Sequence, residues 1–371
     1  MRLYSKLLGS ISRVGPVLFL LSCSSVVPVQ RATPLAEEDI LPPRYSLVYI
    51  IHGDGGYLYH DSLGNEYRAD EETLDGAMTV AEQNTEAEVF IFHEKRRRRF
   101  LRLLWPLRDG KFYYYRNGRL LATESYRRDQ GPSRFDPEVA LYHRFRADGG
   151  SQPVKLFLYF GHEIPEFGGA GYDASYKKRT FTTEDLAGGL KSMTGDSTPF
   201  DLIILSTCFN GTPHTISTLG PYARYIIASP DNLHLSYFDD QPLERLDIGR
   251  QDGDVAEFAT SFARHSFDRL KTELQTAVTV AVYDVDRVQG YLNSVESVYA
   301  DALRALDSEK PAFAEHYDCA EDAAYSLPRM SEGVEVLFRP ARFGREKNKQ
   351  SHSGWECIRR GSEVRMPAPN E

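Results

Sequence analysis

Cys208 and His162 are the two residues whose types and surroundings best suit nucleophilic catalysis. Cys208 follows the apolar run Leu202–Leu205 in "DLIILSTC", and His162 follows another apolar run in "VKLFLYFGHE". A cysteine attacks as its thiolate, and a nearby histidine can accept the thiol proton. The alternative interpretation of Cys208 is a small buried core residue, the commoner role for a lone cysteine.

The surrounding elements are expected to bring these two side chains together. Apolar runs bounded by turn residues predict strands at 44–56, 87–95, 154–163, 201–208 and 222–230. Helical spacing predicts helices at 70–84, 136–150 and 182–193, the last with a capping-box-like start. Strands that alternate with helices pair in parallel, and their carboxyl ends share one edge of the sheet. We therefore expect Cys208 and His162 to project into one crevice.

The remaining elements extend this α/β pattern. The turn signals Asp109-Gly110 and Asn117-Gly118 predict an antiparallel ribbon. Residues 254–308 are mostly helical in pattern, and "GVEVLFRP" at 333–340 predicts a late strand. The net charge of −9 and the ordinary globular composition argue against a nucleic-acid partner.

The N-terminus is typical of an export signal. Residues 1–22 combine a basic start with a short apolar segment, too short to span a membrane. "LLSC" before and at Cys23 resembles the lipobox of bacterial lipoproteins, which implies lipid on Cys23 and, with Ser24 following, an outer-membrane location. Residues 23–43 predict a tether from the lipid to the folded body. The alternatives are an ordinary secretory signal or an uncleaved anchor.

The cysteine count fits an oxidising compartment. The chain has four cysteines, Cys23, Cys208, Cys319 and Cys357. If Cys23 carries lipid, an odd number remains, and one thiol stays outside any disulfide. Cys319 and Cys357 could pair, which would leave Cys208 as that thiol, but the sequence alone does not establish the pairing.

Several segments, in order, resemble the clostripain-like cysteine peptidases, the C11 group of the caspase-like clan. The resemblance covers most of the mature chain and rests on "YSLVYIIHGDGG", "VKLFLYFGHE", "GAGYDASYKKRTFTTEDLAGGL", "FDLIILSTCFNG", and "GVEVLFRP" followed by Trp355. It implies a three-layer α/β/α caspase-like core with a mostly parallel sheet at 44–240. It also implies a C-terminal helical portion at 241–371 that returns one strand to the sheet.

The resemblance also implies a mechanism. Cys208 would attack a peptide carbonyl, and His162 would protonate the leaving amine. Backbone N–H groups near His162 and at Cys208 would hold the oxyanion. We expect the start of the next helix to lower the pKa of the Cys208 thiol. The expected partner is a peptide or protein substrate, and no cofactor is implied.

Two positions depart from the family pattern, and a third completes the expected site. Glu163 follows the catalytic histidine where the family usually has glycine, which places a carboxylate beside the oxyanion site. Ser206 stands two residues before Cys208, where the family often has an aspartate that pairs with a basic P1 side chain. We expect Asp54, after the first strand, to line the crevice.

Three alternatives remain. "HGDGG" at 52–56 resembles the oxyanion loop of α/β-hydrolases, but the chain has no Gly-x-Ser-x-Gly elbow. His52, Asp54, His60 and Asp61 could ligate a metal ion, although their spacing matches no established metal signature. The last alternative is a catalytically inactive lipoprotein that binds a peptide or protein partner in the same crevice.

Overall fold

The computed structural model describes most of the chain after the predicted tether. The described residues are 42–55, 57–60, 66–96, 99–100, 105–106, 108–128, 134–147, 152–169, 171–195, 198–233, 237–249, 252–307 and 314–360. The predicted signal at 1–22, Cys23 and all but the last two residues of the tether lie outside these ranges. Within the described residues, no helix is both long and apolar enough to cross a bilayer.

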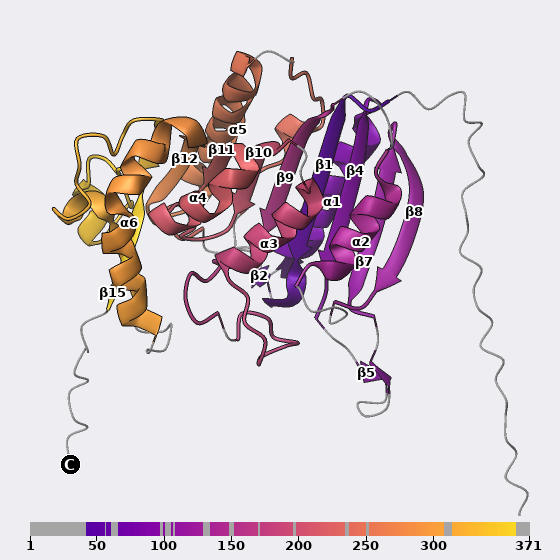
Figure 1. Ribbon diagram of the computed structural model, residues 1–371, viewed down its shortest axis with the longest axis horizontal. Coiled ribbons are helices and arrows are strands. Elements are labelled where there is room, and N and C mark those ends of the chain that lie inside the picture. Colours follow the sequence, from indigo (N-terminus) through magenta and orange to yellow (C-terminus); the bar gives the residue numbers. More distant parts are fainter. Residues whose placement is uncertain are drawn as a thin grey trace, which may run out of the picture. The chain divides into compact units, whose positions relative to one another are not determined.

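A nine-stranded mixed sheet forms the centre of the fold, in the order β14-β12-β11-β10-β9-β1-β4-β7-β8 (Figure 1). The strands from β11 to β4 pair in parallel, and antiparallel strands extend the sheet at both ends. The bounds are β1 (Tyr45–His52), β4 (Ala87–Glu94), β7 (Gly110–Arg116), β8 (Arg119–Tyr126), β9 (Val154–Phe160), β10 (Phe200–Ser206), β11 (Ala223–Ala228), β12 (Val278–Asp284) and β14 (Val334–Arg339).

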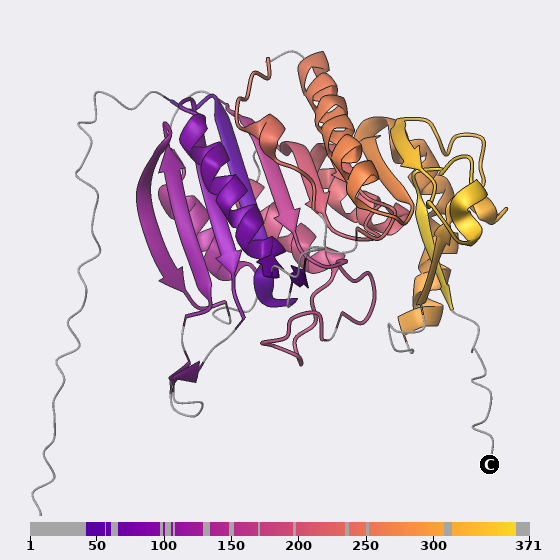
Figure 2. The ribbon, with the colours of Figure 1, turned by 180° about the vertical axis from the view of Figure 1, so that it is seen from behind.

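Helices cover both faces of this sheet (Figures 1 and 2). One face packs against α1 (Ala69–Gln83) and α5 (Asp252–Glu273). The other packs against α2 (Asp136–Phe145), α3 (Thr183–Thr194), α4 (Pro213–Leu219) and α6 (Val285–Asp307). All eight residues of β1 are buried, as expected for a parallel strand between two helical layers. The three-layer arrangement predicted from the sequence is confirmed.

The predicted helices are present, with small differences at their ends. α3 begins with the expected capping box, in which Thr182 and Asp185 each bond to the other's backbone N–H. α2 ends at Phe145, five residues before the predicted end at 150, because Arg146 leaves the helical region with a ψ of 144°.

The C-terminal part differs from the expectation. It returns two strands to the sheet, β12 and β14, where the sequence indicated one. A separate pair, β13 (Ala314–Asp318) and β15 (Glu356–Arg360), packs beside α6, and the Cys319–Cys357 disulfide links these two segments. The pairing that the sequence left open is therefore present, and Cys208 stays outside it.

The described residues also form several short strands and 3₁₀ turns. They are β2 (Leu58–His60), β3 (Glu66–Arg68), β5 (Arg99–Phe100), β6 (Trp105–Pro106), and the 3₁₀ turns η2 (Gly53–Gly55), η3 (Gly220–Tyr222), η4 (Gln241–Leu243), η6 (Cys319–Glu321) and η7 (Arg345–Asn348).

Candidate active site

Strand register places His162 and Cys208 at equivalent points of neighbouring strands. In the parallel pair of β9 and β10, Phe160 lies opposite Ser206. His162 is two residues past Phe160, and Cys208 is two residues past Ser206. The backbone N–H of Gly161 also donates to the carbonyl of Ser206, at 3.4 Å. The two side chains therefore emerge at the same edge of the sheet.

His162 is held by the turn that follows β1. Its Nε2 lies 3.2 Å from the carbonyl oxygen of Gly55, and its ring stacks on Tyr57 with centroids 4.4 Å apart. A carbonyl can only accept, so Nε2 carries the proton and Nδ1 keeps the lone pair of the neutral ring. Burial lowers the pKa of His162 below 6.5, opposed by the bond to Gly55. At neutral pH the ring is therefore a neutral base whose free acceptor is Nδ1.

The Cys208 thiol contacts the loop that follows β11. Its S–H donates to Oδ1 of Asn232 over 3.4 Å, and the backbone N–H of Leu233 donates to the sulfur over 3.3 Å. Burial raises the pKa of Tyr57, whose ring stacks on His162, well above its ordinary value. The residues that follow three parallel strands, β9, β10 and β11, thus supply the base, the nucleophile and two polar contacts of the nucleophile.

A turn separates Cys208 from the next helix, whose start was expected to lower the pKa of the thiol. α4 begins at Pro213, and its N-terminus holds a different anion, the carboxylate of Glu166. Glu166 Oε1 accepts from the backbone N–H of Thr215 at 3.2 Å and from its hydroxyl at 2.7 Å. The favourable end of the helix dipole is therefore occupied by Glu166, and we assign it no role in activating the thiol.

Glu163 faces the C-terminal β13–β15 pair. Its Oε1 lies 3.6 Å from Nε2 of His316, and that ring stacks on Phe209 with centroids 4.0 Å apart. Burial, and then the nearby Glu166, raise the pKa of Glu163 to about 8. Solvent reaches the side chain, which is 39 % exposed, and opposes this shift. The negative charge expected beside the oxyanion position is therefore reduced at neutral pH.

Ser206 lines a small pocket of about 20 Å³ under the sheet edge, whose walls include Tyr237 and Phe238. Its hydroxyl accepts from the backbone N–H of Phe238 at 2.8 Å. The acid lining this pocket is Asp240, whose Oδ2 is buried and accepts no hydrogen bond from the described residues. Burial, and then Asp239, raise the pKa of Asp240 to about 7.

Asp54 is buried, 1 % exposed, and anchors the loop 171–181. Its carboxylate accepts from the backbone N–H and the hydroxyl of Ser175, at 2.9 and 3.0 Å. Burial, and then Asp173, raise the pKa of Asp54 to about 6. These contacts hold the buried carboxylate of Asp54 against the loop.

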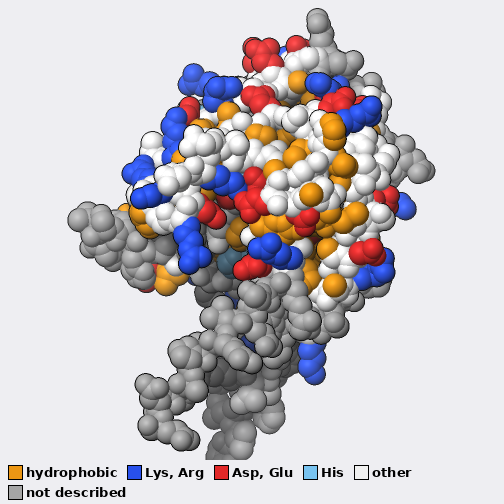
Figure 3. Space-filling view, turned by 90° about the vertical axis from the view of Figure 1, so that its left-hand side faces the viewer, with side chains coloured by type: hydrophobic (Ala, Val, Ile, Leu, Met, Phe, Trp, Pro, Cys, Tyr) orange, Lys and Arg blue, Asp and Glu red, His pale blue; other side chains and the backbone are white. Residues whose placement is uncertain are grey.

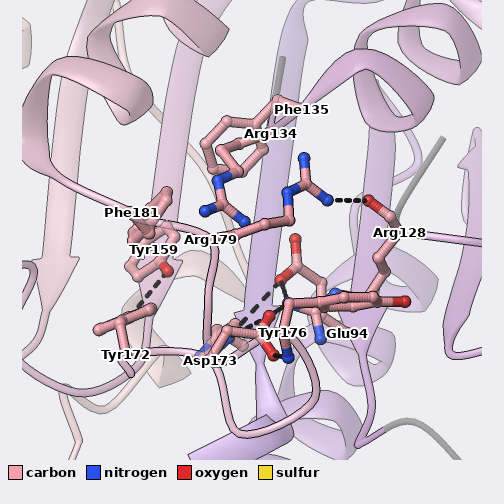
Figure 4. A pocket seen from close by; sticks show the side chains of 11 residues that line it. Glu94, Arg128, Arg134, Phe135, Tyr159, Tyr172, Asp173, Tyr176, Arg179 and Phe181 are labelled. Atoms are coloured by element: carbon pink, nitrogen blue, oxygen red, sulfur yellow. Dashed lines mark hydrogen bonds and ion pairs between the residues drawn. The ribbon is translucent and has the colours of Figure 1, made fainter. Parts of the chain in front are cut away.

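A buried arginine, Arg128, lies among the acids near Asp54, two of which, Glu94 and Asp173, are shown with it in Figure 4. Nη2 of Arg128 contacts Glu94 at 2.8 Å and also bonds to Asp173, while Nη1 lies 3.7 Å from Asp54. His52, Asp54 and Asp173 bring ligand atoms within 4.8 Å of one another, the spacing a metal ion could use. Arg128 already contacts both aspartates of this group, so we assign no metal ion to them. The side chain of His60 and all of Asp61 lie outside the described residues.

Several residues of this site were not predicted from the sequence. Gly55, Tyr57, Asn232 and Asp240 lie in aperiodic loops. Position relative to strand ends is the signal that could have found the first three, because each follows the carboxyl end of β1 or β11. Asp240 lies twelve residues beyond the end of β11, and no local pattern marks it.

The site lies within a segment that is similar to a known protein family. The model of the clostripain family matches residues 161–336, which contain both His162 and Cys208. No curated protein sequence matches the chain.

The structure resembles an inactive zymogen C11 protease from Parabacteroides distasonis, with 15% sequence identity, a TM-score of 0.51, and coverage of 86% of this chain and 92% of that chain. A secreted C11 cysteine protease from Bacteroides thetaiotaomicron, "iotapain", gives 12% identity, a TM-score of 0.49 and coverage of 71% of each chain. The first of these similarities shows a shared fold. The resemblance inferred from the sequence is therefore confirmed: over the segment that holds His162 and Cys208, this chain is similar to the clostripain family of cysteine peptidases.

Proposed function

We propose that this protein is a cysteine endopeptidase that uses Cys208 as nucleophile and His162 as base. The observation that carries the proposal is the shared register of β9 and β10, which delivers both residues to one edge of the sheet. The bond between Gly55 and Nε2 supports it, since it leaves Nδ1 of His162 to take a proton.

The proton transfers follow from these contacts. The S–H bond of Cys208 breaks as the sulfur attacks the substrate carbonyl, and its proton, until then hydrogen-bonded to Asn232 Oδ1, passes to Nδ1 of His162. His162 then gives that proton to the departing amine, which leaves a thioester on Cys208. In the second half, His162 takes a proton from water, and the resulting hydroxide attacks the thioester and expels the Cys208 thiolate. The acid product is released, and His162 returns its proton to the sulfur, which restores the thiol and the neutral ring.

Covalent labelling combined with peptide cleavage tests this function. A peptide acyloxymethylketone should label the wild type on Cys208 and leave Cys208→Ala unlabelled, with peptide cleavage abolished. His162→Ala should cost a comparable factor, because nucleophile and base act as a unit. His214→Ala is the matched control, since this histidine pairs with Glu184 at 2.8 Å on α3, and it should retain activity. A folded wild type that takes no label and cleaves no peptide would instead support the inactive binding protein.

We propose that the polar groups of Ser206 and Asp240, rather than the small volume now present beside them, decide the preference for the residue before the scissile bond. Ser206 removes one expected carboxylate, but Asp240 supplies another to the same pocket. Ser206→Asp should raise cleavage after Lys or Arg by adding a charge-assisted partner. Asp240→Asn should lower cleavage after these residues relative to cleavage after Leu. Equal effects on all peptides would show that the pocket does not read this residue.

We further propose that lipid on Cys23 anchors the protein in the cell envelope, in the outer membrane. The Cys319–Cys357 disulfide supports export, because such bonds persist in oxidising compartments. Metabolic labelling with a palmitate analogue should mark the wild type and spare Cys23→Ser. Equal labelling of both proteins would contradict the anchor.

A further inference from the structure

A second cavity, of about 430 Å³, lies beside the nucleophile and reaches into the C-terminal β13–β15 pair. Its lining includes Phe209, the residue after Cys208, and Asn232, which bonds to the Cys208 thiol. A polypeptide whose scissile carbonyl sits at Cys208 therefore lies across the mouth of this cavity. The volume falls in the range of ordinary ligand pockets.

The lining of this cavity is acidic beyond what its own cations balance. Lys349 pairs with Asp318 at 3.3 Å and with Glu321 at 3.2 Å, and Arg359 pairs with Glu315 at 3.1 Å. The six lining acids are Asp231, Glu315, Asp318, Glu321, Glu346 and Glu356. Figure 3 views the molecule from the side of these C-terminal elements, where acidic and basic side chains are interspersed.

Among the lining acids, the carboxylate of Glu356 would be stabilised most by a bound cation. The residue is 3% exposed, and the ion pairs given for the described residues join its carboxylate to no lysine or arginine. Its nearest basic neighbours are Nδ1 of His316 and Nε2 of His352, each at 3.7 Å. Burial lowers the pKa of His316 to about 4 and also lowers the pKa of His352, so neither ring offers a positive charge at neutral pH. Burial, followed by Asp231 and Asp318, raises the pKa of Glu356 well above its ordinary value.

The geometry favours an organic cation over a metal ion. The described residues bring three candidate ligand atoms within 4.8 Å of one another at His52, Asp54 and Asp173, and not in this cavity. His352 is also unsuited as a ligand, because its Nδ1 accepts from the backbone N–H of Gly354 at 3.0 Å, which places the proton on Nε2. An ammonium or guanidinium group on a flexible side chain needs only a carboxylate and room.

We propose that this cavity binds a basic side chain of the polypeptide substrate, at a position other than P1, with Glu356 as the carboxylate that receives it. The inference rests on the proposed peptidase function. His316 joins the cavity to the catalytic loops, since it stacks on Phe209 and lies beside Glu163. A bound cation is therefore next to both loops that carry the dyad.

A positional scan tests the proposal. A quenched fluorescent peptide that the wild type cleaves is varied with Lys or norleucine at each of three positions on either side of the scissile bond, P1 excepted. Lysine should raise kcat/KM at least tenfold over norleucine at one position. Glu356→Gln should bring that ratio to about one, while Glu296→Gln, which removes an exposed acid of α6 outside this cavity, should leave it within twofold. No preference at any position, or a preference that survives Glu356→Gln, overturns the proposal.

A binding experiment separates this proposal from the peptidase assignment. Acetyl-lysine methylamide and acetyl-norleucine methylamide, with the α-amine acetylated and the side chain free, are titrated into Cys208→Ala and into Cys208→Ala with Glu356→Gln, using NMR. The lysine compound should bind the first protein at least tenfold more tightly than the second, whether or not any peptide is cleaved. Equal binding of the lysine compound to both proteins would refute the proposal. Saturable binding of Ca²⁺ to Cys208→Ala that is lost on adding Glu356→Gln would also refute it, because the site would then bind a metal ion. If Glu356→Gln does not fold, the lysine and norleucine comparison in the wild type still decides.

Discussion

Replacing Gly55 by alanine should disable the base without touching a reacting group. A β-carbon at position 55 would lie 2.4 Å from both Cδ2 and Nε2 of His162. Ordinary contacts begin at 3.4 Å, so the imidazole must move by about 1 Å, and its 3.2 Å bond to the Gly55 carbonyl is lost or bent. The Tyr57 ring stacked on His162 restricts where the imidazole can go.

The size of the effect follows from the cost of misplacing a catalytic group. A displacement of about 1 Å costs on the order of 100-fold in rate. That factor corresponds to about 2.7 kcal/mol of activation free energy. We expect the loss in kcat for a fluorogenic peptide, with KM nearly unchanged, because Gly55 contacts the base.

Two controls make the reasoning refutable. Gly188→Ala, on the exposed face of α3 with nothing within 4 Å of the added carbon, should keep full activity. In a His162→Ala background, Gly55→Ala should cost nothing further, because the base is already gone. A folded Gly55→Ala protein with more than half of wild-type kcat, or an equal loss in the His162→Ala background, would show that Gly55 does not act through His162.

Three further predictions concern ionisable groups. Asn232→Asp places a carboxylate within about 3.4 Å of the Cys208 sulfur and should raise the pKa of the thiol by at least about one unit. The pH profile of alkylation by iodoacetamide should therefore shift toward higher pH. An unshifted profile would contradict the contact between Asn232 and the thiol. Activity of the wild type should fall as pH rises through the raised pKa of Glu163, at or below about 8, because the charged carboxylate then disfavours the oxyanion; Glu163→Gln should remove that fall, and Glu163→Gly should raise activity further. Glu138 is fully buried in α2, and burial raises its pKa from 4.5 to about 8. As the pH rises, this carboxyl therefore ionises in the unfolded chain before it ionises in the folded protein. The stability of the wild type should decline between these two pH values. Relative to Glu138→Gln, the decline should reach roughly 2–4 kcal/mol in urea unfolding, and parallel stability curves would refute it.

The sheet was predictable where strands are buried on both faces. β1, β4, β9 and β10 are short runs of Val, Ile, Leu and aromatic residues ended by turns, and parallel pairing then follows from the intervening helices. β12 was missed because "VTVAVYD" runs directly into α6 and lies between two long helical patterns. This segment is a strand because it pairs with β11 and β14. Such pairing between distant segments leaves no signal in the local sequence.

The candidate site was predictable only in part for the same reason. The dyad positions follow from strand ends, which local sequence marks. The contacts that set their chemistry do not: Gly55 and His162 are 107 residues apart, and Arg128 and Asp173 are 45 residues apart. Glu166 illustrates the limit, because only its place in space shows that it occupies the helix terminus expected to serve Cys208.

Arg128 makes assembly of the loop beside the site independent of the ions in the medium. The cation that holds Glu94, Asp54 and Asp173 is covalently part of the chain, so the loop has the same counter-charge at any salt composition. A substitution such as Arg128→Met would remove that charge while leaving His52, Asp54 and Asp173 at the spacing a divalent ion could bridge. We expect the order of the loop in that variant to depend on the divalent ions in the medium. One residue thus separates a protein whose site is assembled on folding from one whose site would respond to its surroundings.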